Sequence, residues 1–291
     1  MRVTVLGGAA WNRMVHLDRL PDGRAATVHP TWHHDAIGGA GAGKALNLAR
    51  LGVEVTLFAG LGDDEAGARV RAGLVGGGVD VRAATDPSGT PQHVNLMDPA
   101  GGRISIMLEN GSAELPIDAD SIASSLGAAD VVVVDLAPWT PRILDLAQAS
   151  GRPVWTDLHD YDRSSAWYIP FVDAADVVFA SGDRLPDPAG FLRSLIAAGK
   201  GLAVCTLGID GAIALDADGR SYEVPALPDV EVVDSNGAGD AFFAGVLFGV
   251  LDGAPLESAL RFGSLAAAMA VGSSDLASDE LDPARVRAGV I

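Results

Sequence analysis

Short apolar runs alternate with helix-periodic segments along this 291-residue chain, and this alternation constrains the fold more than any other feature. Runs of this length are typical of buried strands, and they occur at residues 3–6, 56–59, 131–135, 154–157, 177–180 and 202–207. Apolar residues at helical spacing occur at 42–49, 64–75, 140–150, 188–199, 239–251 and 256–271. The alternation predicts one α/β domain over residues 1–291, with a mainly parallel sheet covered by helices on both faces.

Two other segments have a different period. In residues 26–33 and 92–108, apolar and polar residues alternate one by one, which predicts strands with one apolar and one solvated face. The run Pro99-Ala100-Gly101-Gly102 suits a hairpin turn within the second segment. We therefore expect a small antiparallel β lid, formed by segments at about 12–35 and 91–112, that projects from the α/β core.

The apolar face of this lid would include Val28, Trp32, Val94, Leu96, Ile104 and Ile106. Large apolar faces are rarely left bare, so the core, a ligand or a second subunit must cover this one. A lid over an active site is the interpretation that we favour. A homodimer through the lid is left open.

Composition narrows the class of partner. Acidic residues outnumber basic ones 38 to 20, and the formal net charge is −18. Such a surface repels nucleic acid and anionic membranes, so we expect a small-molecule substrate and neither of those partners. The absence of a long apolar run or a signal-like N-terminus predicts a cytoplasmic protein. The single cysteine, Cys205, lies in an apolar run, where a buried, inert thiol is expected.

The strongest functional signal is Asp-Ser-Asn-Gly-Ala-Gly-Asp at 234–240, which follows a predicted strand at 230–233 and leads into a predicted helix. Glycines at a helix N-terminus let backbone N–H groups point at an anion, which the helix dipole also favours. Asp240 falls in the first helical turn, where a carboxylate can take a proton from an attacking hydroxyl. The residues alone leave a second interpretation open, in which Asp234 and Asp240 only cap the helix.

This segment resembles the C-terminal signature of the ribokinase, or PfkB, family of carbohydrate kinases, usually D-T-x-G-A-G-D-x-F-x-x-G, with Ser235 in place of threonine. The resemblance implies a ribokinase-like fold and an ATP-dependent kinase with Asp240 as catalytic base. It also implies that the amides of Gly237, Ala238 and Gly239 form an anion hole for the γ-phosphate. ATP and Mg²⁺ are the implied cofactors, and dependence on a monovalent cation is left open.

Other segments match the family along nearly the whole chain. Residues 204–212 resemble its T-x-G-x-x-G turn, which approaches the ATP phosphates, although the same residues also suit an ordinary hairpin. Residues 38–52 resemble the N-terminal signature, and residues 261–268 resemble a late helix near the adenine site. The resemblance implies nucleotide binding by Thr206, Gly208, Gly211 and Asn236.

Three positions depart from the family pattern. Asn12 stands where a sugar-binding aspartate is usual, and Gly43 where a sugar-binding asparagine is usual. Arg184 replaces the glutamate of an N-x-x-E motif tied to magnesium and phosphate handling, so no metal ligand is assigned. The expected substrate-binding residues are Asn12, Gly38, Gly39, Gly43 and Asp240.

These departures predict an acceptor larger than, or differently shaped from, free ribose. Nucleosides and modified sugars are the first candidates. The alternative is an ordinary sugar, with lid residues such as His16, His33 or Asn95 replacing both lost contacts. Gly43 would open space beside the acceptor, while Trp11 offers an aromatic surface and Lys44 a positive charge.

Several competing site classes are weaker. Residues 38–45 nearly match a P-loop, but Ala45 lacks the hydroxyl that binds magnesium. The first glycine turn lacks the G-x-G-x-x-G pattern of dinucleotide enzymes. His33 and His34 are adjacent on a predicted strand and point to opposite faces, which makes a poor metal site. A strand end is followed by Asp157, His159, Asp160 and Asp162, which suit either a solvated loop or a phosphate-side or metal-water role. A non-catalytic nucleotide- or sugar-binding regulator is the alternative function.

Overall fold

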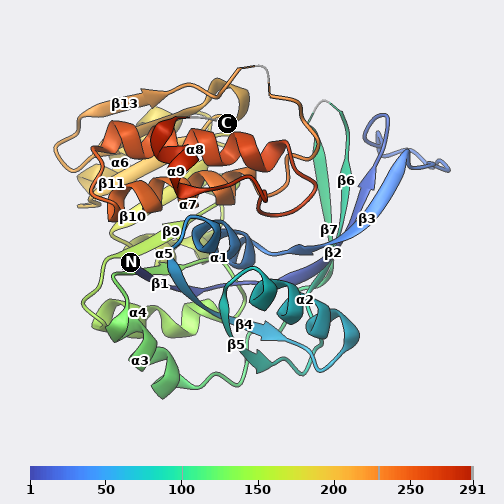
Figure 1. Cartoon of the computed structure of the whole chain (residues 1–291), viewed down its shortest axis with the longest axis horizontal. Coiled ribbons are helices and arrows are strands. Elements are labelled where there is room, and N and C mark those ends of the chain that lie inside the picture. Colours follow the sequence, from blue (N-terminus) through green and yellow to red (C-terminus); the bar gives the residue numbers. More distant parts are fainter. Residues whose placement is uncertain (100, 229, 290–291) are drawn as a thin grey trace.

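The larger of two sheets forms the centre of the molecule. The computed structural model describes residues 1–99, 101–228 and 230–289. The strands of this sheet are β1 (Arg2–Leu6), β4 (Glu54–Leu61), β5 (Asp80–Thr85), β8 (Val131–Val134), β9 (Val154–Asp157), β10 (Val177–Ser181), β11 (Leu202–Thr206), β12 (Ala212–Asp216) and β13 (Ser221–Val224). Their order is β13-β12-β11-β10-β9-β8-β1-β4-β5, with parallel pairing from β11 to β5 and antiparallel pairing at β12 and β13 (Figure 1).

Helices cover both faces of this sheet, as the sequence predicts. One face packs on α1 (Ala40–Arg50), α2 (Glu65–Gly76), α7 (Ala238–Leu251), α8 (Leu256–Val271) and α9 (Pro283–Ala288). The other packs on α3 (Ala119–Ala128), α4 (Leu144–Ala149), α5 (Ile169–Ala174) and α6 (Pro188–Ala197). Short 3₁₀ helices lie at Thr140–Ile143, Ala166–Tyr168 and Gly208–Asp210. None of the described helices is long and apolar enough to cross a membrane.

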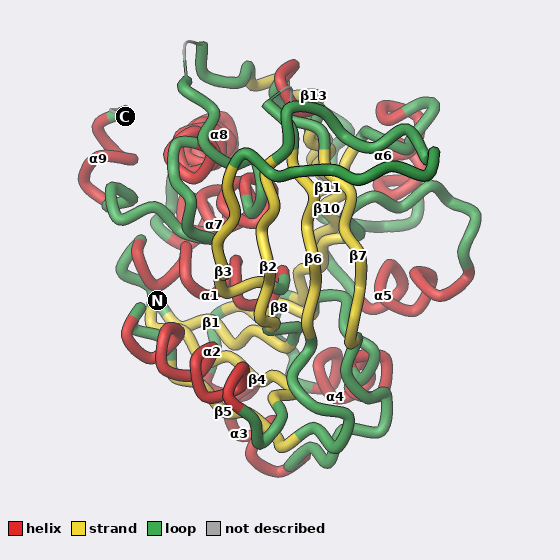
Figure 2. The backbone as a smooth tube through the Cα atoms, turned by 90° about the vertical axis from the view of Figure 1, so that its right-hand side faces the viewer, coloured by secondary structure: helices red, strands yellow, loops and turns green. Residues whose placement is uncertain are grey.

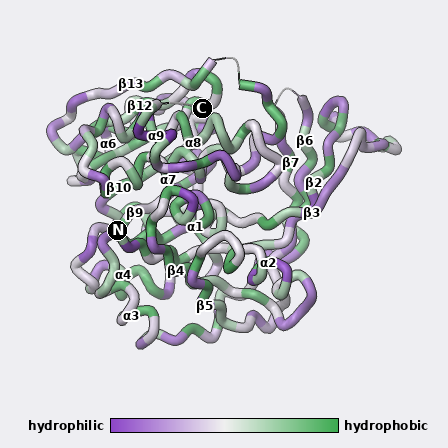
Figure 3. The backbone as a smooth tube through the Cα atoms, viewed as in Figure 1, coloured by the Kyte–Doolittle hydropathy of each residue, from purple (hydrophilic) through white to green (hydrophobic). Residues whose placement is uncertain are grey.

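Strand β8 shows why the central strands are apolar throughout. Val131 and Val133 belong to one hydrophobic cluster, and Val132 and Val134 belong to the other. Because both faces are buried, no position on this strand can be polar without facing a core. Hydrophobic segments accordingly concentrate in the interior, with hydrophilic ones mainly at the periphery (Figure 3).

Helices α7 and α8 pack at very close range because glycines line their contact. A Cβ on Gly245 would lie 2.5 Å from the carbonyl of Phe262, and one on Gly263 would lie 2.7 Å from the side chain of Val246. Helix α7 is therefore held firmly between α8 and α1. This packing fixes the position of the first turn of α7, which carries Asp240.

A smaller sheet stands beside the core, built from β2 (Ala10–His16), β3 (Trp32–Gly38), β6 (Gln92–Met97) and β7 (Arg103–Glu109). The order is β3-β2-β6-β7; β2–β3 and β6–β7 are antiparallel, and β2 and β6 pair in parallel (Figure 2). We call this sheet the lid. Side chains alternate across it, so Asn12 and His16 share one face, the inner face, while Trp11 and Arg13 lie on the outer face.

Some sequence predictions about strands are wrong. Residues 26–31 and 230–233 were expected to be strands, and the structure has none there. The first stretch is exposed. Thr31 donates to the carbonyl of His16 at the end of β2, but the pairing does not continue, and Pro30 lacks an N–H. In the second, Val233 donates to the carbonyl of Val271 at the end of α8 instead of to a strand. Alternation alone does not make a strand without a partner.

The predicted faces of the lid also need correction. Trp32 was grouped with the apolar face, but it pairs with His16 and therefore lies on the inner face. It stacks on the His16 ring, with centroids 3.8 Å apart. The other predicted apolar residues of β6 and β7 do share one face, the outer face. In the predicted hairpin turn, Ala100 lies outside the described residues.

Candidate active site

The carboxyl ends of neighbouring parallel strands lie along one edge of the large sheet, which is where open α/β sheets bind ligands. Strand β8 leads into Asp135, and β11 ends at Thr206. Two backbone hydrogen bonds tie the intervening segments together: Ser181 donates to the carbonyl of His159 (2.6 Å), and Gly182 donates to that of Thr206 (2.8 Å). Motifs that are distant in sequence are thereby brought to one edge.

The first turn of α7 has the geometry of an anion site. Gly237 precedes the helix with φ 82° and ψ −4°, a left-handed conformation that glycine adopts readily. No side chain of the described residues caps this helix, and the first amides of a helix have no partner within it. Ala238 makes only a long bond to the carbonyl of Ser235 (3.4 Å). The amides of this turn are therefore placed to meet an anion.

Neither aspartate of the signature caps α7, so the interpretation of both as caps is wrong. Asp234 accepts a hydrogen bond from the backbone of Asn236 (2.7 Å) within the preceding turn. The amide oxygen of Asn236 in turn accepts from Arg103 of the lid (3.2 Å). Asp240 turns away from its own helix end toward Lys44. The turn thus links the lid to the helix that carries Asp240.

Lys44, in α1, lies at the centre of a buried cluster of charged side chains. Its side chain has no exposed surface, and its Nζ is 2.6 Å from Asp240 Oδ1, 2.8 Å from Asp135 Oδ2 and 3.2 Å from Asp157 Oδ2. Burying an isolated ion costs on the order of several kcal/mol. The three carboxylates explain how a lysine can be held in the interior, and its charge faces the cluster.

His159 contributes a second cation to this cluster. Its Nε2 is 2.8 Å from Asp135 Oδ1, and its Nδ1 is 3.6 Å from Asp157 Oδ2. Burial alone would lower the pKa of His159, but the two carboxylates raise the pKa to about 9. The residue also has φ 50°, which is uncommon for a residue other than glycine. We call these five side chains (Lys44, Asp135, Asp157, His159 and Asp240) the charged cluster.

The three carboxylates of the cluster differ in proton affinity. Burial raises the pKa of Asp240, while the charges of Lys44 and His159 oppose that rise. For Asp135, burial also favours the neutral form, but the two cations outweigh it and hold the pKa well below its usual range. The pKa of Asp157 is likewise lowered by His159 and Lys44 against the effect of burial. Asp240 is therefore the carboxylate of the cluster that accepts a proton most readily.

Gly43 lies against Asp240 and leaves no room for a side chain. A Cβ on residue 43 would be 2.5 Å from Asp240 Oδ2. The space that the missing side chain was expected to open for an acceptor is therefore occupied by the catalytic candidate itself. Trp11, the expected aromatic surface, lies on the outer face of the lid, where Arg69 stacks over its ring at 5.5 Å.

Asn12 is buried on the inner face of the lid beside the Gly-Gly step. Its Oδ1 has no hydrogen-bond partner among the described residues. A Cβ on Gly38 would be 2.0 Å from Asn12 Nδ2, and one on Gly39, where φ is 90°, would be 2.7 Å from the carbonyl of Gly8. These glycines let the chain pass close to β2 as it enters α1.

Thr206, Gly208 and Gly211 lie together on the tight connection between β11 and β12. The backbone of Leu207 donates to the carbonyl of Gly211 (2.7 Å), and the two strands are antiparallel. Gly211 has φ 89°, and a Cβ there would be 2.0 Å from the carbonyl of Val224. The segment is thus a hairpin, positioned at the same sheet edge as the charged cluster.

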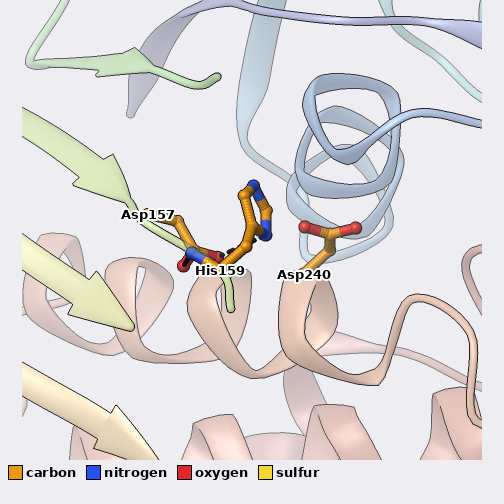
Figure 4. A group of neighbouring side chains, drawn as sticks. All are labelled: Asp157, His159 and Asp240. Carbon is orange, nitrogen blue, oxygen red and sulfur yellow. Dashed lines mark hydrogen bonds and ion pairs between the residues drawn. The ribbon is translucent and has the colours of Figure 1, made fainter. Parts of the chain in front are cut away.

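The charged cluster does not fit a divalent metal as it stands. Asp157, His159 and Asp240 offer ligand atoms within 4.8 Å of one another (Figure 4). However, Lys44 already contacts both carboxylates, and the neighbouring carboxylates raise the pKa of His159 to about 9, which favours its charged form. A third centre of positive charge there would be repelled by two cations.

The altered N-x-x-E segment offers no replacement carboxylate at its last position. Arg184 contacts Asp162 (2.7 Å) and Asp160 (3.7 Å), which follow β9. The positive charge of Arg184 is thus balanced by Asp160 and Asp162.

Part of the charged cluster was not predicted from the sequence. Asp135 was taken only as the end of a strand, and His159 as part of an acidic loop. A usable signal was present, because Asp135 and Asp157 each end an apolar run and so fall at the same sheet edge. Lys44 lies among small residues on a helix, where nothing local indicates which carboxylates it meets.

Comparison with known proteins agrees with this fold. The chain is 36% identical over 280 residues to acarbose 7(IV)-phosphotransferase from Actinoplanes sp. (92% of this chain, 91% of that protein) and 30% identical over 281 residues to a nucleoside kinase from Methanothermobacter thermautotrophicus (91% and 88%). A solved structure of the microbiome-derived acarbose kinase Mak1 superposes with a TM-score of 0.86 at 28% identity, over 99% of this chain and 97% of that one. The family model of the pfkB family carbohydrate kinases matches residues 5–282. The chain belongs to the pfkB family of carbohydrate kinases.

Proposed function

We propose that this ATP-dependent kinase transfers the γ-phosphate of ATP to a hydroxyl of a carbohydrate, with Asp240 as the general base. The acceptor hydroxyl loses its proton to Asp240 while its oxygen forms a bond to the γ-phosphorus. The bond between that phosphorus and the bridging oxygen breaks, and ADP leaves. The products are a phosphorylated acceptor, ADP and a proton held at first on Asp240.

The observation that carries this proposal is the joint placement of Asp240 and the turn before it. The carboxylate and the amides of Gly237, Ala238 and Gly239 lie on the same first turn of α7. A base and an anion hole on adjacent residues let one element hold both the attacking oxygen and the transferred phosphoryl group. The raised proton affinity of Asp240 within the charged cluster supports its part in accepting the proton.

For ATP, we propose contacts from Thr206, Gly208 and Gly211 at the β11–β12 connection and from Asn236 in the turn before α7. Both segments present backbone groups at the sheet edge, which suits the phosphates of a nucleotide. We propose Mg²⁺ as the companion of ATP, and we assign it no ligand from this chain.

The acceptor is proposed to lie along the inner face of the lid, in contact with Asn12, Gly38 and Gly39. Three of the four buried side-chain atoms without a hydrogen-bond partner among the described residues are on this face: Asn12 Oδ1, His34 Nδ1 and His16 Nε2, which lies 3.9 Å from Asp234 Oδ2. Buried polar atoms are costly unless a ligand or water satisfies them. Because Asn12 and His16 are four residues apart on one strand, about 13 Å, we propose an acceptor longer than one sugar ring.

The outer face of the lid is proposed as the surface of a homodimer. Ile104, Ile106 and Leu108 are exposed there, next to Val94 and Leu96. A second copy of the same apolar face would cover it. Analytical ultracentrifugation of the wild type and of an Ile106→Glu variant tests this, since the variant should be monomeric.

ADP release over a panel of acceptors tests the proposed activity. The panel contains ribose, glucose, nucleosides, linear disaccharides and trisaccharides, and acarbose. We expect turnover with acceptors of more than one ring and poor turnover with ribose. Efficient phosphorylation of ribose alone would contradict the acceptor assignment. Binding of ATP without ADP release on any acceptor would favour the regulator instead.

A further inference from the structure

Lys44 is one of only two lysines in a chain with 20 basic residues, and it is completely buried. The second, Lys200, donates to backbone carbonyls of Asp173 and Ala175. At every other basic position the chain uses arginine. A compact ammonium group with three donors fits among three converging carboxylates, whereas the planar fork of arginine does not. The geometry of the charged cluster therefore requires lysine.

The contacts of Lys44 exclude a direct role in catalysis or in binding. An ammonium group has three donors, and here each has a carboxylate within 3.2 Å. These carboxylates, against the effect of burial, hold the pKa of Lys44 well above its usual range, so it cannot act as a base. Without exposed surface it cannot touch an acceptor.

The charges in the cluster nearly balance. Three aspartates carry −3, and Lys44 with charged His159 carries +2, so the net charge is −1. These five groups come from α1, from the ends of β8 and β9, and from α7. When Asp240 accepts a proton, the cluster becomes neutral. Without Lys44 the same site would hold −2, and the largest charge that opposes protonation of Asp240 would be lost.

We propose that Lys44 is a positioning residue that keeps the general base Asp240 ionised and fixes the direction of its carboxylate, an inference that rests on the proposed function. Lys44 Nζ holds Oδ1 at 2.6 Å. Gly43 allows this approach, because a Cβ at that position would collide with Oδ2. Gly43 and Lys44 thus act together: Gly43 leaves room for the carboxylate of Asp240, and Lys44 binds one of its oxygens.

The test is the pH profile of kcat for Lys44→Met, a substitution that keeps the length of the side chain and removes its charge. At pH 7 we expect kcat to fall by roughly 10²-fold, within the range that loss of a general base costs. The acid limb of the profile should move to higher pH, so that activity recovers in part as the pH is raised. The KM for ATP should stay within about twofold, because Lys44 does not contact the proposed nucleotide residues.

Lys200→Met is the matched control, and it should leave both kcat and the acid limb unchanged. A purely structural role for Lys44 predicts a loss of kcat that is the same at every pH. That result, or a variant with wild-type kcat and profile, overturns the proposal. If the wild type itself releases no ADP, the proposed function fails first, and the two failures are distinguishable.

A second measurement reads the charge of Asp240 in the wild type and does not depend on the folding of Lys44→Met. In wild-type protein labelled with ¹³C at the aspartate carboxyls, the Asp240 signal is assigned by its loss in Asp240→Asn. We expect an ionised Asp240 across the pH range of activity. A protonated Asp240 at pH 7 in the wild type contradicts the role of Lys44.

Discussion

The charged cluster and the inner face of the lid are both polar and largely buried, with His159 partly exposed, but they differ in how their polar groups are satisfied. In the cluster, Lys44 and His159 are each held by carboxylates, at distances down to 2.6 Å and 2.8 Å. On the lid, Asn12, His16 and His34 each leave a buried atom without a hydrogen-bond partner among the described residues. The first region is complete without a ligand, and the second is not.

This difference separates two tasks of a kinase. Groups that handle the proton must be in place before the acceptor arrives, because pre-organised charges need no rearrangement during the reaction. Groups that recognise the acceptor must stay open until it binds, and they gain their hydrogen bonds from it. Changes in the cluster should therefore affect kcat, and changes on the lid should affect KM and acceptor preference.

Filling the space beside Asp240 should have the largest effect among the variants that test this comparison. In Gly43→Ala, the added methyl group would lie 2.5 Å from Oδ2 and displace the carboxylate. A misplacement of about 1 Å costs roughly 10²-fold in rate. We expect that loss in kcat with little change in KM for ATP, measured by ADP release. Gly127→Ala, where a Cβ meets nothing within 4 Å, is the control. Wild-type kcat in Gly43→Ala would refute the tight packing at this site.

An intermediate effect is expected on the lid. Asn12→Ala removes a side chain with an unpartnered oxygen, so it should raise the KM for the acceptor by about tenfold, the equivalent of one hydrogen bond. The value of kcat should change much less. Steady-state kinetics with saturating ATP measures both. A fall in kcat with unchanged KM would place Asn12 with the catalytic groups and break the comparison.

A smaller effect should depend on the length of the acceptor. His16 lies about 13 Å along β2 from Asn12, so His16→Ala should lower kcat/KM for a trisaccharide by roughly fivefold, or about 1 kcal/mol. The same variant should leave a single-ring acceptor unaffected. Equal losses for both acceptors would show that the site is no longer than one ring.

The least visible effect is on stability. Because the folded state raises the pKa of His159 to about 9 from 6.5, the charged ring stabilises the fold fully below pH 6.5. That contribution is lost as the pH rises through about 9. Urea unfolding at pH 6.5, 8 and 9.5 should show a declining free energy of unfolding, and His159→Gln should decline less. If the free energy of unfolding declines equally with pH in both proteins, the charge of His159 does not stabilise the fold.

The sequence predicted the parallel sheet and its helices because burial on both faces leaves a strong local pattern, as in β8. It also located the turn before α7, whose glycines and Asp240 form a contiguous motif. It did not predict the charged cluster, because Lys44, Asp135 and His159 meet only through the tertiary fold. It misplaced strands at 26–31 and 230–233, since pairing requires a neighbour that local alternation does not supply.

The most direct test of the account is ADP release by Asp240→Asn, measured with the best acceptor of the panel. The substitution preserves shape and removes the charge that the cluster is built to hold. We predict a fall in kcat of about 10² to 10⁴-fold, with folding and ATP affinity retained. Turnover at the wild-type rate by a folded Asp240→Asn protein would contradict the central claim that this carboxylate accepts the proton of the acceptor.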